Sequence, residues 1–378
     1  MKRLIDICDI QYGYAFDSKC FTEDSSYPQL VRIRDVKRGY SETYYSGDYP
    51  EEYILSEGDL LVGMDGEFNI ARWKCSGALL NQRVCKLVAK IGTNEEYLRF
   101  AMSKSLKEIE QRTAFVTVKH LSAKELNKLE LDVPELTKQD KIADILSRLE
   151  RVIEARKEEL EELDGLIKAR FVEMFGDPVT NPKGLPIVTL GELSELITKG
   201  ASPSWQGFSY TDDSSQTIFV TSENVREGYI DLSLPKYIED GFNEKQKRSV
   251  IHKGDFLINI VGASIGRAAQ FNLDCKANMN QAAALVRVKD SRVRDKYLLT
   301  YLNSDRAQRM YDSMKSDTGR ANLSLQDISD LLILLPNVEQ QIEFETFVNQ
   351  VDKSKVAVQK TLEQTQTLFD SLMQKYFG

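Results

Sequence analysis

The sequence predicts an α+β protein in which two similar globular domains are joined by two long antiparallel coiled-coil helices with pseudo-two-fold symmetry. Three observations predict this fold class: a faint duplication along the whole chain, a heptad pattern after each copy, and a composition that supports real cores. Of the 378 residues, 42% are apolar and 29% are charged. Since a domain takes about 100–200 residues, the chain holds two or three domains, and disorder or a disulfide-stapled mini-protein is excluded.

The duplication is the first element of this prediction. Matching segments keep the same order in both copies, and their separation grows slightly in the globular parts and then stays constant. Small loop insertions in the second copy explain why the separation grows, and a final element of equal length in both copies explains why it then stays constant. The matched segments are 31–40 with 220–229, 54–61 with 250–257, Asn81-Gln82 with Asn280-Gln281, 120–122 with 322–324, Gln139 with Gln341, and 175–176 with 377–378.

Each copy is predicted to begin with a mixed region and to end with a long helix. Apolar runs at 58–62 and 254–260 are typical of strands, and the last strand of each copy ends at Pro134 or Pro336. The segment 176–186 is rich in proline and glycine, which is typical of a linker. The expected parts are a globular domain at 1–138, a central helix at 139–176, a second globular domain at 177–338 and a C-terminal helix at 339–378.

The two long helices are predicted from an apolar repeat of seven. The stretch 139–176 has no proline and one interior glycine, Gly165, so it could form a helix about 57 Å long. Its apolar series is that of a coiled-coil seam, with Arg156 and Arg170 as basic interruptions. The predicted seam residues are Leu146, Leu149, Ile153, Leu160, Leu163 and Ile167 in the first helix and Val348, Val351, Val358, Leu362, Phe369 and Leu372 in the second.

Two equal helices with matching apolar stripes are expected to pack on each other. Because a whole domain separates them in sequence, an antiparallel pair with a globular domain at each end is the simplest closed arrangement. Such a pair has an approximate two-fold axis through its middle. The alternative is that each helix packs on its own domain or drives homodimerisation.

Composition narrows the partners and the location that we expect. The net charge of −8 at pH 7 argues against a protein that binds nucleic acid by bulk positive charge. A DNA contact would then need a local basic face or partners that supply positive charge. No apolar run approaches the length of a membrane helix, and the N-terminal stretch is not a secretory signal, so we expect a cytoplasmic protein. Five cysteines without a CxxC motif predict buried free thiols and neither zinc nor disulfides.

Several stretches together resemble a known family. They are GDFLINIVGASIGRAAQF at 254–271, its counterpart GDLLVGMDGEFNIARW at 58–73, the two Asn-Gln pairs, NLSLQDISDLLILLPNVEQQ at 322–341 and the paired helices. In their order and duplication they resemble the specificity (S) subunit of type I restriction-modification systems, over nearly the whole chain. The first copy departs from the pattern at 116–131, where the signature of the second copy is weak.

The resemblance implies a function for each part. Each globular unit would be a target recognition domain that reads one half of an asymmetric, bipartite site in double-stranded DNA. The helices would set the spacing and dock two modification (methyltransferase) subunits, and restriction/translocase subunits would join in systems that have them. The resemblance implies no cofactor in this chain, with S-adenosylmethionine, ATP and Mg on the partner subunits. A rod of this length could hold the two domains about one turn of duplex, or about 34–36 Å, apart.

Candidate DNA contacts are chosen by chemistry and by neighbouring turns. Arginine pairs with guanine, Asn or Gln pairs with adenine, and glycine lets a backbone approach phosphate. Arg32, Arg34 and Arg38 alternate along a predicted strand and would project from one side. The turn sequences YGYAF at 12–16 and KGASP at 199–203 could also face the groove. The complete candidate set is Arg32, Arg34, Arg38, Arg72, Lys74, Arg83, Lys199, Ser202, Asn224, Arg226, Arg267, Arg320 and Asn322.

Each candidate has a structural alternative. The arginines and lysines beside glycine loops, Arg72, Lys74, Arg83 and Arg267, could equally be solvated surface charges or members of ion pairs. For Asn81-Gln82 and Asn280-Gln281, recurrence in both copies favours a loop-stabilising role over base reading.

No catalytic motif is found in the sequence. The tetrapeptides that grip a target adenine are missing, as are a P-loop and a GxGxxG that opens a helix. We therefore expect a non-catalytic recognition subunit. Two other classes remain as alternatives: a coiled-coil scaffold whose globular ends bind proteins, and a self-sufficient methyltransferase, which would have to bind S-adenosylmethionine.

Overall fold

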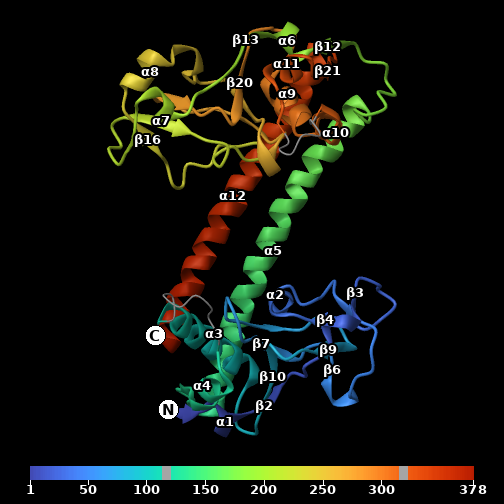
Figure 1. Cartoon of the computed structure of the whole chain (residues 1–378), viewed down its shortest axis with the longest axis vertical. Helices are drawn as coiled ribbons and strands as arrows, with labels where there is room; N and C mark the ends of the chain where they lie inside the picture. The colour runs from blue at the N-terminus through green and yellow to red at the C-terminus, as the bar shows by residue number, and fades with distance from the viewer. Residues whose placement is uncertain (113–120, 315–321) are drawn as a thin grey trace. The chain divides into compact units, whose positions relative to one another are not determined.

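The computed structural model describes residues 1–112, 121–314 and 322–378. The chain forms two compact units, shown with their element labels in Figure 1. Unit 1 consists of Met1–Glu158 together with Gln359–Gly378, and unit 2 consists of Glu159–Val358. Within the described ranges, no helix combines the length and the apolar character that crossing a membrane requires.

Unit 1 is built on a four-stranded antiparallel sheet with smaller sheets beside it. The main sheet has the strand order β2 (Cys8–Tyr12), β10 (Val84–Ala89), β7 (Leu60–Gly63) and β8 (Asn69–Arg72). A second sheet has the order β4 (Leu30–Val31), β9 (Ala78–Leu80) and β6 (Ile54–Leu55), with β4 and β9 parallel. The remaining pairs are β1 (Lys2–Arg3) with β11 (Glu130–Leu131) and β3 (Phe21–Thr22) with β5 (Tyr44–Tyr45).

Unit 2 repeats this arrangement strand for strand in its main sheet. The main sheet has the order β13 (Ser194–Lys199), β20 (Ala283–Val288), β17 (Phe256–Asn259) and β18 (Ala268–Gln270). The second sheet has the order β14 (Tyr210–Thr211), β16 (Tyr237–Ile238), β15 (Thr217–Val220) and β19 (Ala277–Met279), with β15 and β19 parallel. The last pair is β12 (Ile187–Thr189) with β21 (Leu332–Leu334). The common order confirms the internal duplication predicted from the sequence.

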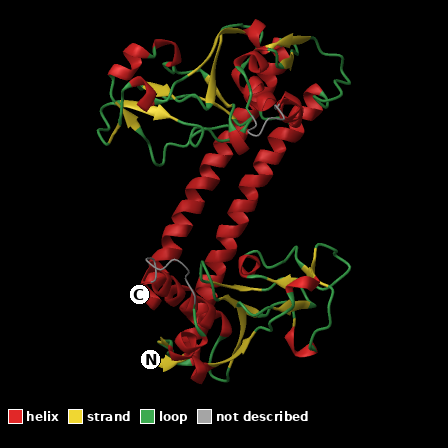
Figure 2. Cartoon of the chain, viewed as in Figure 1, coloured by secondary structure: helices red, strands yellow, loops and turns green. Residues whose placement is uncertain are grey.

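Helices, most of them short, connect these strands. Figure 2 shows short strands, short helices and parts of the long helices in both units. In unit 1 the helices are α1 (Leu4–Ile7), α2 (Ile33–Val36), α3 (Glu95–Arg112) and α4 (Ala123–Lys128), with 3₁₀ turns η1 (Ser18–Cys20) and η2 (Glu51–Tyr53). In unit 2 they are α6 (Leu190–Leu193), α7 (Pro203–Gln206), α8 (Gly241–Lys245), α9 (Asp295–Leu302), α10 (Asp305–Met314) and α11 (Leu325–Ser329), with η3 (Lys247–Ser249) and η4 (Gly262–Ser264).

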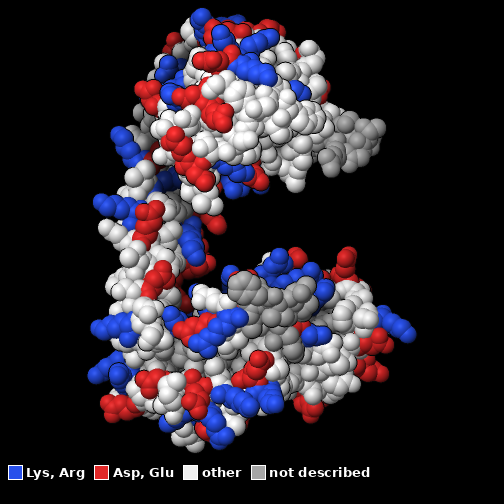
Figure 3. Space-filling view, turned by 60° about the vertical axis from the view of Figure 1, so that its left-hand side comes forward, with Lys and Arg blue, Asp and Glu red and all other residues white. Residues whose placement is uncertain are grey.

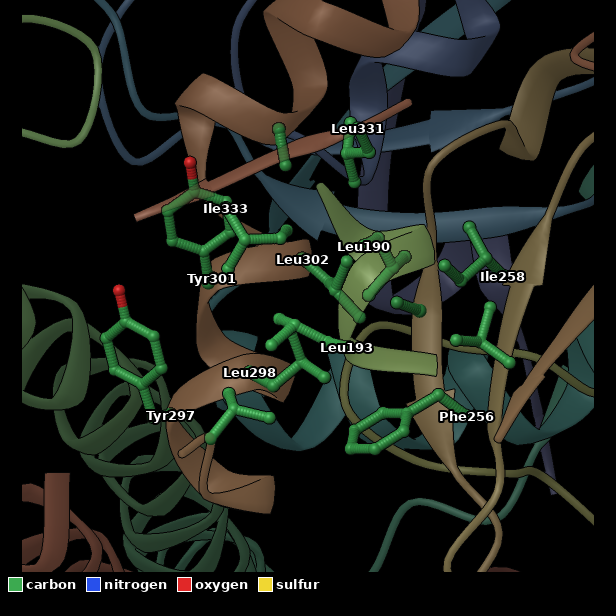
Figure 4. Packing of buried hydrophobic residues seen from close by; sticks show 14 of the residues in the cluster. Leu190, Leu193, Phe256, Ile258, Tyr297, Leu298, Tyr301, Leu302, Leu331 and Ile333 are labelled. Atoms are coloured by element: carbon green, nitrogen blue, oxygen red, sulfur yellow. The ribbon is translucent and has the colours of Figure 1, made fainter. Parts of the chain in front are cut away.

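The central strands of each unit are buried on both faces. In β17, Phe256 and Ile258 join the core beneath the helices, whereas Leu257 joins a separate core shared with the second sheet. This double burial explains why such strands read as continuous apolar runs in the sequence. Figure 4 shows the first of these cores, in which β17 meets α6 and α9. The labelled residues are Leu190, Leu193, Phe256, Ile258, Tyr297, Leu298, Tyr301, Leu302, Leu331 and Ile333.

The long helices α5 (Leu136–Phe175) and α12 (Val338–Phe377) each have 40 residues. Each begins two residues after the proline that ends the preceding segment, because proline restricts the residue before it and is tolerated just ahead of a helix. All twelve predicted seam residues are buried or half-buried. In unit 2, Asp164 pairs with Lys355 and Arg170 pairs with Glu343, so the two helices run antiparallel there.

Each unit contains the start of one long helix and the end of the other. In unit 1, the end of α12 packs on α3, with the rings of Phe377 and Tyr97 5.3 Å apart. In unit 2, the end of α5 packs on α9, with the rings of Phe175 and Tyr297 4.9 Å apart. These contacts contradict the alternative that each helix packs only on its own domain.

A buried glutamine joins the start of each long helix to its globular part. Gln139 accepts from the Asn94 backbone N–H (2.9 Å) and donates to the carbonyls of Gly92 (3.1 Å) and Pro134 (2.7 Å). Gln341 makes the same three bonds in unit 2, from Arg294 N–H (2.8 Å) and to the carbonyls of Arg292 (2.9 Å) and Pro336 (2.8 Å). Both side chains are fully buried.

All five cysteines are free thiols. Cys8 and Cys85 are buried, and burial raises the pKa of each to about 12. Cys275 is exposed, and Cys20 and Cys75 are partly exposed. The expectation that every cysteine is buried was therefore wrong for these three, because the loops that carry them lie at the surface. Among the described residues, no cluster of three or more His, Cys, Asp and Glu side chains could hold a metal ion.

Candidate nucleic-acid interface

Several loops of each unit meet at one edge, which we call the loop edge. In unit 1 it comprises the loops 13–16, 32–39, 64–68 and 81–83, and in unit 2 it comprises 200–206, 221–229, 260–267 and 280–282. The strand register brings these loops together. Strand β10 starts where its neighbours β2 and β7 end, and the parallel strands β4 and β9 end side by side. The same register recurs in unit 2. Most candidate residues therefore lie at the loop edge, although they are far apart in sequence.

The Asn-Gln turn is the structural centre of the loop edge. Asn81 Oδ1 accepts the Gln82 backbone N–H (2.8 Å), and Asn280 Oδ1 accepts that of Ala282 (3.0 Å). A glycine packs closely against each turn. A Cβ added to Gly13 would lie 2.1 Å from the Asn81 carbonyl oxygen, and a Cβ added to Gly200 would lie 1.7 Å from the Met279 carbonyl oxygen. Only glycine fits such a close approach. The asparagines thus have the loop-stabilising role that the sequence analysis favoured.

The segment after β4 is a short helix, and the predicted strand was wrong. Its backbone turns because Asp35 Oδ2 accepts the Arg32 backbone N–H (3.0 Å) and the Ser41 hydroxyl (2.9 Å). Asp35 is buried, whereas Arg32, Arg34 and Arg38 are exposed. The alternation of apolar and basic residues resembled a strand, but the buried carboxylate at the third helical position stabilises a helical turn instead.

Four basic side chains lie on the 32–39 loop of unit 1, and the Lys74 side chain packs over the end of that loop. We call these five residues the basic cluster: Arg32, Arg34, Lys37, Arg38 and Lys74. The Lys74 side chain belongs to it because it packs over Gly39, where a Cβ would lie 2.6 Å from Lys74 Cγ. The ion pairs in the cluster are long, and their basic side chains are exposed: Arg34 with Asp35 at 3.8 Å, Lys37 with Glu67 at 3.7 Å and Arg38 with Glu42 at 3.9 Å. Such pairs contribute little, so these cations remain available to another partner.

The equivalent segment of unit 2 is different. Asn224 is buried, its Oδ1 accepts from Thr221 N–H (2.9 Å) and its Nδ2 donates to the Asp231 carbonyl (2.9 Å). It stabilises the turn as Asp35 does in unit 1, and its assignment as a base-reading residue stays a prediction. The exposed acids of this segment also have partners, since Glu223 pairs with Lys236 (2.8 Å) and Glu227 pairs with Lys168 (3.0 Å).

Arg72 lies at the opposite edge of the main sheet. It is in register with Leu60 at the start of β7, and its guanidinium donates to the carbonyl of Gly58 and pairs with Glu95 and Glu96. Burial opposes its charge, but the hydrogen bonds and charges of Glu96 and Glu95 outweigh this and hold the pKa of Arg72 above its ordinary value. The structure therefore does not bring Arg72 to the loop edge, and its assignment to DNA contact stays a prediction. Its counterpart by register is Gln270, which donates to Gly254 O and Asp295 Oδ2.

The position of Arg72 away from the loop edge gives a prediction for Arg72→Gln, a substitution that introduces the residue type found at the counterpart Gln270. Losing a half-exposed ion pair should lower the free energy of unfolding by about 1 kcal/mol. DNA retention by the assembled complex should stay within about twofold of the wild type, measured by filter binding. Arg267→Gln should instead weaken retention by about fivefold, corresponding to about 1 kcal/mol for a lost contact at the loop edge. A larger binding loss for Arg72→Gln than for Arg267→Gln would contradict the placement.

The other candidates divide by the partners of their side chains. Arg83 pairs with Asp65, Arg226 pairs with Asp231 (3.6 Å), and the Ser202 hydroxyl bonds that of Ser204 (3.2 Å). Lys199, Arg267 and Asn322 are exposed, and Asn322 bridges to Val261 beside the 260–267 loop. Arg320 lies outside the described residues.

Sequence reasoning missed two residues at the loop edge. Lys37 stands in the same basic run as Arg34 and Arg38, and this run was the signal that could have identified it. Trp205 is 89% exposed on α7, two residues after KGASP. An exposed position cannot be read from the sequence, but a tryptophan in a turn bounded by proline and glycine was a usable signal.

Comparisons with known proteins agree with this arrangement. The model of the type I restriction modification DNA specificity domain matches the chain twice, at residues 1–164 and 182–365. The specificity subunit of the type I restriction enzyme EcoBI of Escherichia coli is 30% identical to this chain over 397 aligned residues. The alignment covers 98% of this chain and 84% of that protein.

Two solved structures share the fold. The S subunit of a type I restriction-modification system from M. genitalium has a TM-score of 0.57 at 15% identity, covering 100% of this chain and 95% of that one. A chain from a structural study of complex assembly and conformational transition of the type I R-M system has a TM-score of 0.54 at 20% identity, covering 100% and 96%. The protein described here therefore belongs to the family of type I restriction-modification DNA specificity subunits.

Proposed function

We propose that this chain is the DNA-recognition subunit of a type I restriction-modification complex, with unit 1 and unit 2 each reading one half of a bipartite site. One observation carries the proposal: the two units share one backbone arrangement at the loop edge but present different side chains there. A shared backbone would give both units the same approach to a duplex, and different donors and acceptors would select different bases. The recognised sequence should therefore be asymmetric.

The chain itself performs no catalysis in this proposal. Membership of a specificity family agrees with the lack of catalytic motifs in the sequence. S-adenosylmethionine, ATP and Mg would belong to the partner subunits. Basic and acidic side chains are interspersed on the face shown in Figure 3, without a continuous basic band. Because affinity for duplex DNA depends on phosphate neutralisation, partner subunits would supply most of the positive charge, and this chain would choose the sequence.

Two modification subunits would dock on the long helices. This is supported by apolar residues on each long helix that lie outside the seam and remain exposed. Ile145 and Val152 are both 40% exposed and lie seven residues apart on α5, and Leu166 is 48% exposed. Leu368, the counterpart of Leu166 on α12, is 50% exposed. Apolar stripes of this kind on a helix favour a protein partner, and the recurrence of the leucine in both helices favours two equivalent docking sites.

Mapping methylated adenines in the host genome, with and without this gene, tests the proposed function. The expected result is a bipartite, asymmetric motif that loses its methylation when the chain is absent and regains it on complementation. An unchanged methylome would refute the proposal and favour the protein-binding scaffold. S-adenosylmethionine binding by the purified chain, measured by thermal shift, would instead favour the self-sufficient methyltransferase.

The basic cluster gives a second, residue-level prediction. In the assembled complex, the triple variant Arg32→Ala, Arg38→Ala and Lys74→Ala should bind target DNA more weakly. Because each lost phosphate contact removes about one unit from the slope of log affinity against log salt, the slope should decrease by up to about three. The measurement is retention of a labelled duplex across a salt series.

A charge-matched control is available on other elements of unit 1. Lys2, Lys107 and Lys128 are exposed and lie on β1, α3 and α4. Replacing these three by alanine changes the net charge equally but removes nothing from the loop edge. If both triple variants lower the slope alike, net charge rather than the basic cluster governs binding.

A further inference from the structure

We infer that Trp205 is a DNA contact of unit 2, with its indole packed against bases of the half-site that this unit reads. The inference rests on the DNA-recognition function proposed above and adds the residue and the mode of contact. Its basis is the unusual exposure of this side chain, the rigidity of the turn that carries it, its position at the loop edge, and the charge around it.

Trp205 leaves a large apolar surface in water. Its side chain is 89% exposed, whereas the second tryptophan of the chain, Trp73, is 1% exposed. Tryptophan carries one of the largest apolar surfaces of any side chain, and burying that surface is favourable at about 25 cal/mol per Å². A nearly fully exposed indole therefore gains substantially when a partner covers it, and such residues often dominate binding energies.

The turn around Trp205 is held in a defined conformation. Pro203 starts α7, and Gly207 ends it in the left-handed region at φ 81°. The Phe208 N–H donates to the Pro203 carbonyl (3.0 Å), and Lys245 Nζ donates to the Gln206 carbonyl (2.8 Å). Phe208 also packs edge-on against Phe242, with ring centroids 5.5 Å apart. An anchored backbone reduces the entropy lost when the indole is covered.

The same turn is fastened to the loop edge at its other end. Gly200 leaves β13 and lies against the carbonyls of Met279 and Asn280, where any side chain would collide. Ala201 then packs into the small core formed by Phe219, Ile238 and Phe242. The Trp205 turn is thus part of the surface that also contains the Asn280 turn.

Local charge favours a polyanion as the partner. No aspartate or glutamate occurs from Leu196 to Thr211 in a chain whose net charge is −8. Lys199 is exposed within this stretch. The segment 221–229 supplies fewer cations than its counterpart in unit 1, because it carries Glu223 and Glu227 where unit 1 has Arg34 and Arg38, and Arg226 is its single basic residue. Unit 2 therefore has fewer cations at its loop edge than unit 1, and an exposed indole on a stretch without acidic side chains suits bases flanked by phosphates.

Fluorescence of the indole tests direct contact. Trp73→Phe leaves Trp205 as the sole tryptophan, and Trp73 Nε1 has no hydrogen-bond partner among the described residues, so phenylalanine loses none. This variant is labelled with 5-hydroxytryptophan and assembled with unlabelled partner subunits, because the label can be excited where ordinary tryptophan does not absorb. The probe is a duplex carrying the motif found by methylome mapping. Two control duplexes each have one half-site scrambled.

The target duplex should quench the label and shield it from iodide. Scrambling the half-site read by unit 2 should abolish this response, and scrambling the other half should leave it largely intact. A label that stays equally accessible to iodide while the complex retains the target duplex would overturn the inference but leave the proposed function standing. A complex that does not distinguish the target from the doubly scrambled duplex would refute the proposed function itself.

Substitutions provide an independent readout. Trp205→Ala should weaken retention of the target duplex about tenfold, and Trp205→Phe should recover most of the loss, since stacking on an aromatic ring tolerates the exchange. Ile187→Ala is the control, because Ile187 is 49% exposed on β12. Equal affinity of Trp205→Ala and the wild type would overturn the inference.

Discussion

Replacing Gln341 by alanine should lower the free energy of unfolding of unit 2 by about 3–5 kcal/mol. The substitution leaves the Arg294 N–H and the carbonyls of Arg292 and Pro336 without their partner. A buried backbone group without a hydrogen bond costs about 1–3 kcal/mol, and the small cavity adds to this cost. Gln139→Ala should have a similar effect in unit 1, where the same three bonds occur.

Chemical denaturation of the full chain measures this effect. Because the units are separate compact bodies, each variant should shift the transition of its own unit. Gln340→Ala is a matched control one position away, since its side chain makes no hydrogen bond among the described residues and is only half-buried. If Gln341→Ala unfolds with the same free energy as the wild type, the hydrogen bonds of this glutamine do not contribute to the stability of unit 2.

The second large effect is expected for Phe344→Ala. Phe344 is fully buried on α12, and its ring lies 5.5 Å from the rings of both Phe171 and Phe175 on α5. Removing a buried phenylalanine costs about 3–5 kcal/mol through lost transfer energy and the cavity left behind. The lower stability should appear in the unfolding transition of unit 2, because these three aromatic residues pack α5 and α12 against each other and against Tyr297.

Ile342→Ala separates this packing effect from a general weakening of the helix. Ile342 is two residues away on the same helix and is 47% exposed, so its loss should change the free energy of unfolding by less than about 0.5 kcal/mol. Both variants are compared by calorimetry on the full chain. Similar melting of the two variants would mean that the aromatic contacts add little to the stability of unit 2.

The long helices and the duplication could be predicted because their signals lie in the order of residues along the chain. A seam repeats every seven residues, and all twelve seam positions are withdrawn from solvent. The twin glutamines were visible as a sequence match, but their hydrogen bonds were not, because their partners are backbone groups of another segment. Contacts of this kind have no periodicity.

The candidate site was predicted less well, for three physical reasons. The segment at Arg32 alternates like a strand, but the buried Asp35 stabilises a turn of helix. Arg72 was grouped with Arg267 because both stand near glycine-containing loops, whereas strand register places Arg72 opposite Leu60 and makes Gln270 its counterpart. Asn224 had suitable chemistry for reading adenine, but its burial depends on how Thr221 and Asp231 fold around it.

The composition of unit 1 from both ends of the chain has a consequence for biosynthesis. Residues 159–358 of unit 2 are continuous, whereas unit 1 needs 359–378 to cover α3 and complete its core. Domains usually fold in the order in which the ribosome releases them. The half that is translated first cannot complete its core until residues 359–378 have been made, so we expect unit 2 to fold before unit 1 is complete.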